Sequence, residues 1–185
     1  MKSILSFIWE TVKIAAVTLA IIIPIRYFLV QPFFVKGASM EPNFEDGQYL
    51  VIDELSYRLR QPQRGEVIVF HYPPDPSQFY IKRIIGLPGE KVEISSNQIK
   101  IYNMDHPLGF ILDENGYLPQ VTVTLGSADQ QLGPDEYFVL GDNRQESFDS
   151  RRWGAVPSAN ITGRVWLRAW PPQTAHVFVA PQYSY

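Results

Sequence analysis

The stretch YIKRIIGLPGE, residues 80–90, reads as a β-strand in which two adjacent cations interrupt an apolar run. Successive side chains of a strand point to opposite faces, so Lys82 and Arg83 lie on different faces, each beside large apolar neighbours. If this strand packs into a core, at least one of the two cations points toward apolar surroundings. The sequence therefore raises the question of what a buried lysine or arginine does here.

Outward from this strand, short apolar segments alternate with turn clusters such as QPQRG and PPDPS. The β-branched and aromatic residues of these segments predict strands at 48–53, 66–72, 80–86, 91–95, 98–102, 120–124, 136–140, 163–170 and 176–180. Such a pattern indicates a mainly β, mostly antiparallel domain. Residues 103–132 are the least regular, and we expect a loop-rich insertion there that carries little core.

The N-terminal region differs in kind, because residues 12–30 form an apolar run of 19 residues with charges only at Lys13 and Arg26. A helix needs about 20 residues to cross the hydrocarbon of a bilayer. The sequence therefore predicts a short N-terminus (1–11), one transmembrane helix (12–30) and a β domain (31–185). Two alternatives are a buried core helix and a cleaved signal peptide. The bulky PIRYFLVQPFF stretch disfavours cleavage, and cations on both sides leave the orientation undecided.

Composition excludes several classes of function. The 185 residues carry a net charge of −3 and no basic domain, which argues against a nucleic-acid partner. There is no cysteine, so neither a disulfide nor a thiolate zinc site can form. The three histidines, His71, His106 and His176, are too scattered for metal-type spacing. We therefore expect neither a metal nor another cofactor.

The stretch GASMEPNF, residues 37–44, follows the apolar run after a few residues and contains a candidate nucleophile, Ser39. A serine hydroxyl alone is a poor nucleophile and needs a base. Without such a base, the stretch is an ordinary turn at the entrance to the domain.

Lys82 is the candidate for that base. Unperturbed lysine is neutral in only roughly one molecule in 2,500 at pH 7, but desolvation lowers its pKa and makes the free amine common. Arg83 stays protonated and needs a carboxylate or carbonyl partner on its own face. The alternative is that Lys82 extends to solvent from a strand edge.

A third polar stretch, GDNRQESFDSRRWG at residues 141–154, follows an apolar strand and is dense in charges. Five of its acidic and basic side chains are expected to form a paired network that holds neighbouring elements at a fixed separation, namely Asp142, Arg144, Asp149, Arg151 and Arg152. Ser147 could offer its hydroxyl to a neutral lysine. The alternative is a solvated turn with surface pairs that contribute little stability.

These stretches, in this order behind an N-terminal apolar helix, resemble type I signal peptidases. GASMEP resembles the nucleophile box of that family, RGEVIVFHYP (64–73) its second box, YIKRIIGLPGE its base box and GDNRQESFDSRRWG its last box. The four boxes cover roughly a third of the chain. The resemblance implies a β-rich catalytic domain with a variable insertion at about 91–135, behind one N-terminal transmembrane helix.

The resemblance also implies a serine endopeptidase with a Ser–Lys dyad that removes signal peptides from exported preproteins, cutting after small residues of the A-x-A type. Ser39 matches the nucleophile and Lys82 the general base. Ser147 matches a serine that hydrogen-bonds the lysine. The remaining matches are a supporting charged pair, Asp149 and Arg151, and two structural positions, Asp142 and Arg144.

Two positions depart from the family pattern. Some members have a serine two positions before the nucleophile that helps to bind the oxyanion, whereas this chain has Gly37. The oxyanion hole would then rely on the backbone N–H of Ser39 and a second donor that the sequence does not identify. Gln145 and Glu146 replace a pair that is commonly rich in asparagine, and they receive no role.

The same resemblance implies a location and partners. The N-terminus would lie in the cytoplasm and the catalytic domain outside, at the bacterial plasma membrane. The expected partners are preprotein signal peptides, the lipid bilayer and the secretion machinery. An extended substrate is expected to add to an open strand edge near Ser39 or Lys82. Apolar side chains are expected to contact substrate or membrane, namely Phe33, Phe34, Met40 and Phe44.

Three other functions were weighed against this one. A Ser–His hydrolase could use His71 or His176, although no Asp–His–Ser spacing supports it. A self-cleaving repressor of the SOS-response type would need a DNA-binding domain, which the sequence does not contain. A catalytically inactive, membrane-anchored β module that binds secreted proteins is the third, and turnover of a preprotein discriminates against it.

Overall fold

The computed structural model of the protein describes residues 2–28, 30–120 and 122–183. The side chains of residues 2, 3, 5, 21–28 and 30 lie outside this description. The predicted charge at Arg26, near the end of the apolar run, therefore lies outside the described side chains.

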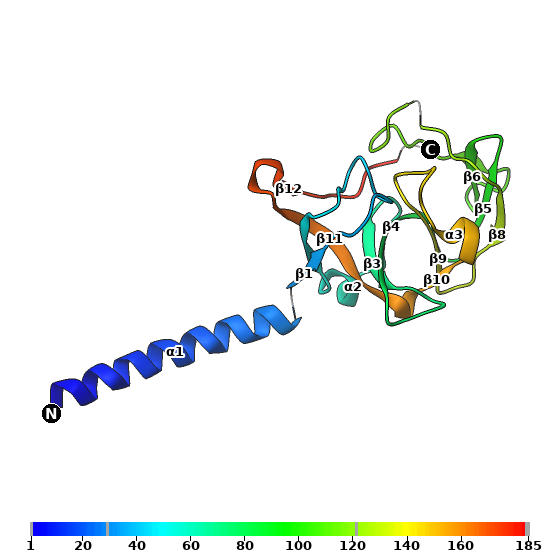
Figure 1. Cartoon of the computed structure of the whole chain (residues 1–185). Helices are drawn as coiled ribbons and strands as arrows, with labels where there is room; N and C mark the ends of the chain where they lie inside the picture. Colours follow the sequence, from blue (N-terminus) through cyan, green and yellow to red (C-terminus); the bar gives the residue numbers. More distant parts are fainter. Residues whose placement is uncertain (1, 29, 121, 184–185) are drawn as a thin grey trace.

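A single long helix, α1 (Lys2–Phe28), projects away from the β domain (Figure 1). Its described apolar side chains are exposed around the helix; Phe7 is 72% exposed and Trp9 is 64% exposed. The helix begins ten residues before the predicted span of 12–30, and Val30 already belongs to strand β1. Within the residues that were described, no helix is both long enough and apolar enough to cross a membrane. The transmembrane anchor stays a prediction.

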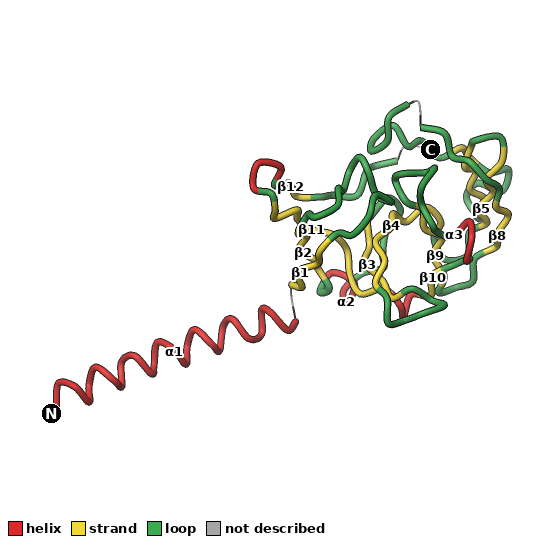
Figure 2. The backbone as a smooth tube through the Cα atoms, viewed as in Figure 1, coloured by secondary structure: helices red, strands yellow, loops and turns green. Residues whose placement is uncertain are grey.

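The β domain contains two antiparallel sheets, whose strands are drawn in yellow in Figure 2. The larger sheet has the order β1-β2-β11-β3-β4-β9-β10, and β12 pairs with β11. Its strands are β1 (Val30–Phe34), β2 (Tyr49–Asp53), β3 (Val67–His71), β4 (Phe79–Gly86), β9 (Glu136–Leu140), β10 (Val156–Pro157), β11 (Ile161–Trp170) and β12 (His176–Val177). The mainly β, antiparallel architecture predicted from the sequence is confirmed.

The smaller sheet lies entirely within the predicted insertion at 91–135. Its order is β7-β6-β5-β8, with bounds β7 (Phe110–Ile111), β6 (Gln98–Tyr102), β5 (Lys91–Ser95) and β8 (Ala128–Gln131). Alternate residues of β5 and β6 are buried, as expected for a sheet with one face on a core. The short helices are α2 (Ser56–Leu59) and α3 (Ser150–Trp153), with 3₁₀ turns at Ser158–Asn160 and Pro172–Thr174.

Several local predictions were wrong. Residues 120 and 122–124 form no strand, although the segment alternates, because no neighbouring strand pairs with it. The predicted strand at 176–180 shortens to two residues. The region 103–132 also carries more core than expected, since Leu112 and Leu118 are buried. Strands β1 and β8 were not predicted; β8 is polar (ADQQ) and forms through backbone pairing with β5.

Candidate active site

Strand β4 buries both of its cations. Lys82 is 4% exposed and Arg83 is 6% exposed, because β4 is covered on both faces from Ile81 to Gly86. Arg83 donates from Nε and Nη2 to the two carboxylate oxygens of Asp142, at 2.8 and 2.6 Å, and from Nη1 to the Gly65 carbonyl at 2.7 Å. The sequence required a carboxylate or a carbonyl partner for Arg83, and the fold provides both.

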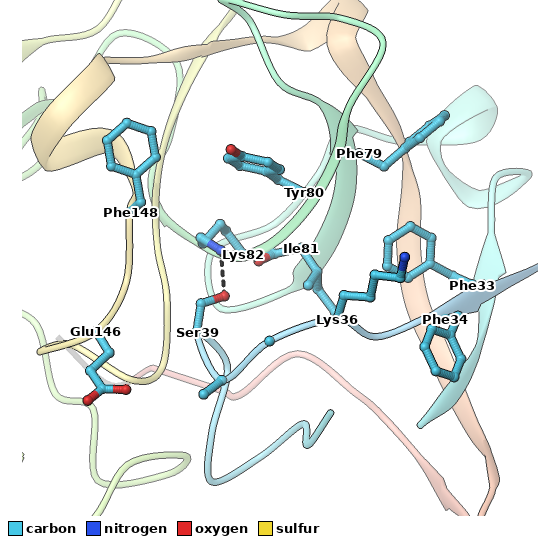
Figure 3. A pocket seen from close by; sticks show the side chains of 12 residues that line it. Phe33, Phe34, Lys36, Ser39, Phe79, Tyr80, Ile81, Lys82, Glu146 and Phe148 are labelled. Atoms are coloured by element: carbon cyan, nitrogen blue, oxygen red, sulfur yellow. Dashed lines mark hydrogen bonds between the residues drawn. The ribbon is translucent and has the colours of Figure 1, made fainter. Parts of the chain in front are cut away.

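The Lys82 amine lies on the opposite face and contacts Ser39. Its Nζ donates to Ser39 Oγ at 2.7 Å and to the Ile81 carbonyl at 2.8 Å (Figure 3). Burial lowers the pKa of Lys82 from its ordinary 10.5 to about 8, and the carboxylates of Asp149 and Asp142 partly oppose this shift. The fold thus pairs a hydroxyl with an amine that loses its proton readily, across 43 positions of sequence.

The Ser39 loop connects β1 to β2, and hydrogen bonds hold it at Gly37 and at the carbonyls of Ala38 and Ser39. Gly37 adopts a φ of +83°, which a residue with a side chain rarely adopts, and its N–H donates to Asp46 Oδ1 at 2.6 Å. From the loop after β9, the Asn143 backbone N–H donates to the Ser39 carbonyl and its Nδ2 donates to the Ala38 carbonyl, both at 3.1 Å. The sequence has no local signal for these two contacts of Asn143.

Four of the five predicted network residues form ion pairs, but not as one network, and Arg152 forms no ion pair with a described residue. Arg151 Nε donates to Asp149 Oδ1 at 2.8 Å, and the Asp149 side chain is fully buried. Asp149 Oδ2 also accepts from the Gly141 N–H at 3.1 Å. Asp142 and Arg144 do not pair with each other, since Asp142 pairs with Arg83 and Arg144 with Glu114 of the insertion. The expected single network is therefore three separate ion pairs.

The expected hydrogen bond from Ser147 to Lys82 is absent. Ser147 Oγ is buried and has no hydrogen-bond partner among the described residues. The Lys82 amine instead uses Ser39 Oγ and the Ile81 carbonyl, while Ser147 lies against Gly141. The Ser39 N–H, by contrast, makes no hydrogen bond within the described part of the chain.

A cleft of about 530 Å³ opens beside Ser39 and Lys82. Phe33, Phe34 and Lys36 lie on one side of it, and Glu146 and Phe148 lie on the other, with Phe79 and Tyr80 along the β4 wall (Figure 3). Residues 79–82 of β4 pair with β3 on one side only, because the pairing with β9 begins at Arg83. The strand edge that faces the cleft is therefore open.

The contacts expected for Met40 and Phe44 are corrected by the structure. Met40 is 1% exposed and Phe44 is 0% exposed, and both belong to a buried apolar cluster with Leu50 of β2 and Val165 of β11. Neither side chain reaches a membrane or the cleft, because the loop folds these apolar residues inward. Phe33 and Phe34 do line the cleft.

A metal site and a Ser–His hydrolase site have less support in the described part of the chain. No group of three or more described His, Cys, Asp or Glu side chains is arranged to hold a metal ion. His71 and His176 are not among the residues that line the cleft, and His71 Nδ1 contacts the Pro76 carbonyl at 2.6 Å. A hydroxyl in contact with a buried amine, beside an open cleft, can perform nucleophilic hydrolysis of an acyl group. This arrangement fits the class of serine hydrolases.

The chain belongs to the signal peptidase family, peptidase S26, which it matches over residues 8–170. Probable signal peptidase I-2 of Synechocystis sp. is 39% identical over 164 residues, covering 85% of this chain and 70% of that protein. Signal peptidase I of Leptolyngbya laminosa is 35% identical over 174 residues, covering 88% and 79%. Signal peptidase I of Pseudomonas fluorescens is 34% identical over 219 residues, covering 90% and 74%.

The family confirms the resemblance drawn from the four sequence boxes and makes the protein a peptidase. The alternative of an inactive binding module finds no support in these relatives.

Proposed function

We propose that the protein is a membrane-bound serine endopeptidase that removes N-terminal signal peptides from exported preproteins, with Ser39 as nucleophile and Lys82 as general base. The observation that carries the proposal is the 2.7 Å contact between Lys82 Nζ and Ser39 Oγ, made by an amine that is 4% exposed. The names of the relatives, which are signal peptidases, support the substrate class.

In the proposed mechanism, neutral Lys82 accepts the hydroxyl proton while Ser39 Oγ attacks the carbonyl carbon of the scissile bond. The Ser39 N–H donates to the oxyanion that forms. The Lys82 ammonium then protonates the leaving amine, which releases the mature chain and leaves the signal peptide as an ester on Ser39. Water, deprotonated by the same amine, attacks this ester and regenerates the hydroxyl.

The substrate in this proposal is an extended segment that adds to the open edge of β4 at residues 79–82. Apolar side chains, among them Phe33 and Phe79, would contact the signal peptide, which is itself apolar. The proposed preference for small residues of the A-x-A type requires shallow subsites beside Ser39.

We further propose that residues 12–30 anchor the chain in the bacterial plasma membrane, with the N-terminus in the cytoplasm and the β domain outside, near the secretion machinery. The exposed apolar side chains of α1, which no other part of the described chain covers, support this proposal. The open cleft lies next to β1, which follows the helix directly.

The experiment is cleavage of a preprotein by the detergent-solubilised full chain, with the products mapped by mass spectrometry. We expect a single cut after a small residue, and no cut by the matched Ser39→Ala variant. Cleavage that persists in the purified variant would mean that another serine or a contaminant is responsible. A folded wild-type chain that cuts no preprotein, with and without added lipid, would contradict the proposed function.

The pH dependence of cleavage is a separate prediction. Because burial lowers the pKa of Lys82 to about 8, the neutral amine is present in roughly one molecule in ten at pH 7. We expect kcat/KM to rise about tenfold per pH unit at acidic pH and to level off above about pH 8. A profile measured with a short peptide substrate checks this. A profile that is flat from pH 6 to 9 would rule out a titrating lysine base.

A further inference from the structure

A turn of the insertion, residues 113–118, contacts both the loop that carries Ser39 and the strand β4 that carries Lys82. We call it the insertion turn. Its two polar contacts come from Glu114 and Tyr117, and neither residue belongs to a segment that resembles the family boxes. The buried Leu118 anchors the turn, whose backbone closes through the Leu118 N–H donating to the Glu114 carbonyl at 2.9 Å.

The first contact is an ion pair between Glu114 and Arg144. The Arg144 side chain is fully buried and donates from Nη1 and Nη2 to the two carboxylate oxygens of Glu114. Two further bonds run from Arg144 to Thr124 Oγ1 at 2.6 Å and to the Gly141 carbonyl at 2.9 Å. A buried guanidinium needs its carboxylate, so Glu114 determines where Arg144 can lie.

Arg144 is the immediate neighbour of the residue that holds the Ser39 loop. Asn143 bonds the carbonyls of Ala38 and Ser39, and the Arg144 carbonyl accepts from Arg151 Nη2 at 2.8 Å. A displacement of Arg144 therefore moves the backbone that fixes Ser39.

The second contact joins the insertion turn to the side of Lys82. The Tyr117 ring lies 4.1 Å from the Arg83 guanidinium, and Arg83 follows Lys82 in β4. The Tyr117 carbonyl accepts from Asn43 Nδ2 at 2.8 Å, and the same amide nitrogen donates to Asp142 at 2.8 Å. The insertion turn thus contacts both the loop that carries Ser39 and the ion pair behind Lys82.

We propose that Glu114 is a positioning residue for the peptidase reaction, which holds Arg144 and, through Asn143, keeps Ser39 in hydrogen-bond contact with Lys82. The proposal rests on the proposed function of Ser39 and Lys82. Glu114 is not among the residues that line the cleft, so it contributes to the geometry of the reacting groups and not to substrate binding. A small displacement of a nucleophile lowers the rate strongly, because the reacting atoms must be aligned.

The test compares Glu114→Gln with a matched control, Asp129→Asn. Both changes neutralise one carboxylate of the insertion, but Asp129 pairs with the partly exposed Lys91 at the surface. We expect Glu114→Gln to lower kcat about tenfold or more with KM within about twofold, and Asp129→Asn to change neither. A rise in KM with kcat unchanged would contradict a positioning role.

A double variant separates positioning from stability. Glu114→Leu with Arg144→Met removes the buried guanidinium together with its partly buried carboxylate, and such replacements by apolar residues often preserve stability. We expect the double variant to melt near the wild-type temperature and still to have the lowered kcat. A double variant with wild-type kcat would overturn the proposal. So would a fall in the activity of Glu114→Gln that is fully explained by a smaller fraction of folded protein.

A readout that does not need turnover distinguishes this proposal from the proposed function. The chain has no cysteine, so Ser39→Cys introduces a single thiol whose alkylation rate can be followed. We expect Glu114→Gln in this background to change the pH at which alkylation becomes fast, since the thiol no longer sits against Lys82. If the pH dependence of alkylation is the same with and without Glu114→Gln, the positioning role is overturned, even if the chain cuts preproteins. If it differs, the positioning role is supported, even if the chain cuts no preprotein.

Discussion

Replacing Lys82 with methionine is expected to lower kcat/KM for preprotein cleavage by about 10²–10⁴-fold, the usual contribution of a positioned general base. Methionine has a similar length and cannot accept a proton. Ser39 would keep its place, because its carbonyl is held by Asn143. The measurement is single-turnover cleavage of a preprotein at pH 8. A variant that cleaves at the wild-type rate would show that the base lies elsewhere.

The same substitution is expected to stabilise the fold. Burial lowers the pKa of Lys82 to about 8 from 10.5, so the folded chain holds the lysine proton less tightly than the unfolded chain does. Below about pH 8 the full cost of burying the charge is present, and it disappears as the pH rises toward 10.5. The excess free energy of unfolding of Lys82→Met over wild type should therefore be largest below about pH 8 and vanish near 10.5.

A control for both effects is Lys91→Met, which removes a lysine from the surface of β5. We expect no change in the cleavage rate and no stabilisation of the fold, because Lys91 is partly exposed and Asp129 raises its pKa instead of lowering it. A loss of activity in Lys82→Met together with lower stability at all pH values would mean that the lysine has a structural role only.

The second large effect is expected at the ion pair behind Lys82. Asp142→Asn leaves the Arg83 guanidinium, whose side chain is 7% exposed, without its carboxylate. Breaking a buried ion pair by removing one partner costs about 3–5 kcal/mol. Since a domain is stable by only about 5–15 kcal/mol, the midpoint of urea unfolding should fall markedly.

A double variant tests the reason for this loss. Arg83→Met with Asp142→Leu removes both buried charges, and we expect it to recover most of the stability of the wild type. The surface change Asp129→Asn should leave the unfolding midpoint unchanged. If Asp142→Asn unfolds at the wild-type urea concentration, the Arg83–Asp142 pair does not stabilise the fold as described.

Much of the architecture could be predicted because the signals are local. The strands β2 to β6 and β9 follow from short apolar or alternating segments between turns, and the need of Arg83 for a partner follows from its place in β4. The pairing of Ser39 with Lys82 came from a resemblance to the family boxes, and the 2.7 Å contact agrees with it.

The partners of the site residues could not be predicted in the same way. Met40 and Phe44 looked available to a membrane but are buried, because only the folded loop decides which way they point. Ser147 makes no bond to Lys82, and Glu114 holds Arg144 although 30 positions separate them. Asn143 reaches Ala38 across 105 positions.

The sequence by itself therefore determined most of the longer strands and the family of this protein, and it singled out Ser39 and Lys82 as candidates for the reactive pair. The alternation of side chains in a strand and the residue preferences of turns depend on residues that are close in sequence, so a short segment is enough to predict them. Only the tertiary structure decided which side chains support Ser39 and Lys82, because an ion pair or hydrogen bond depends on which segments meet in space. These contacts depend on the register of β4 against β3 and β9 and on the path of the insertion turn. Neither can be recognised from a local pattern in the sequence.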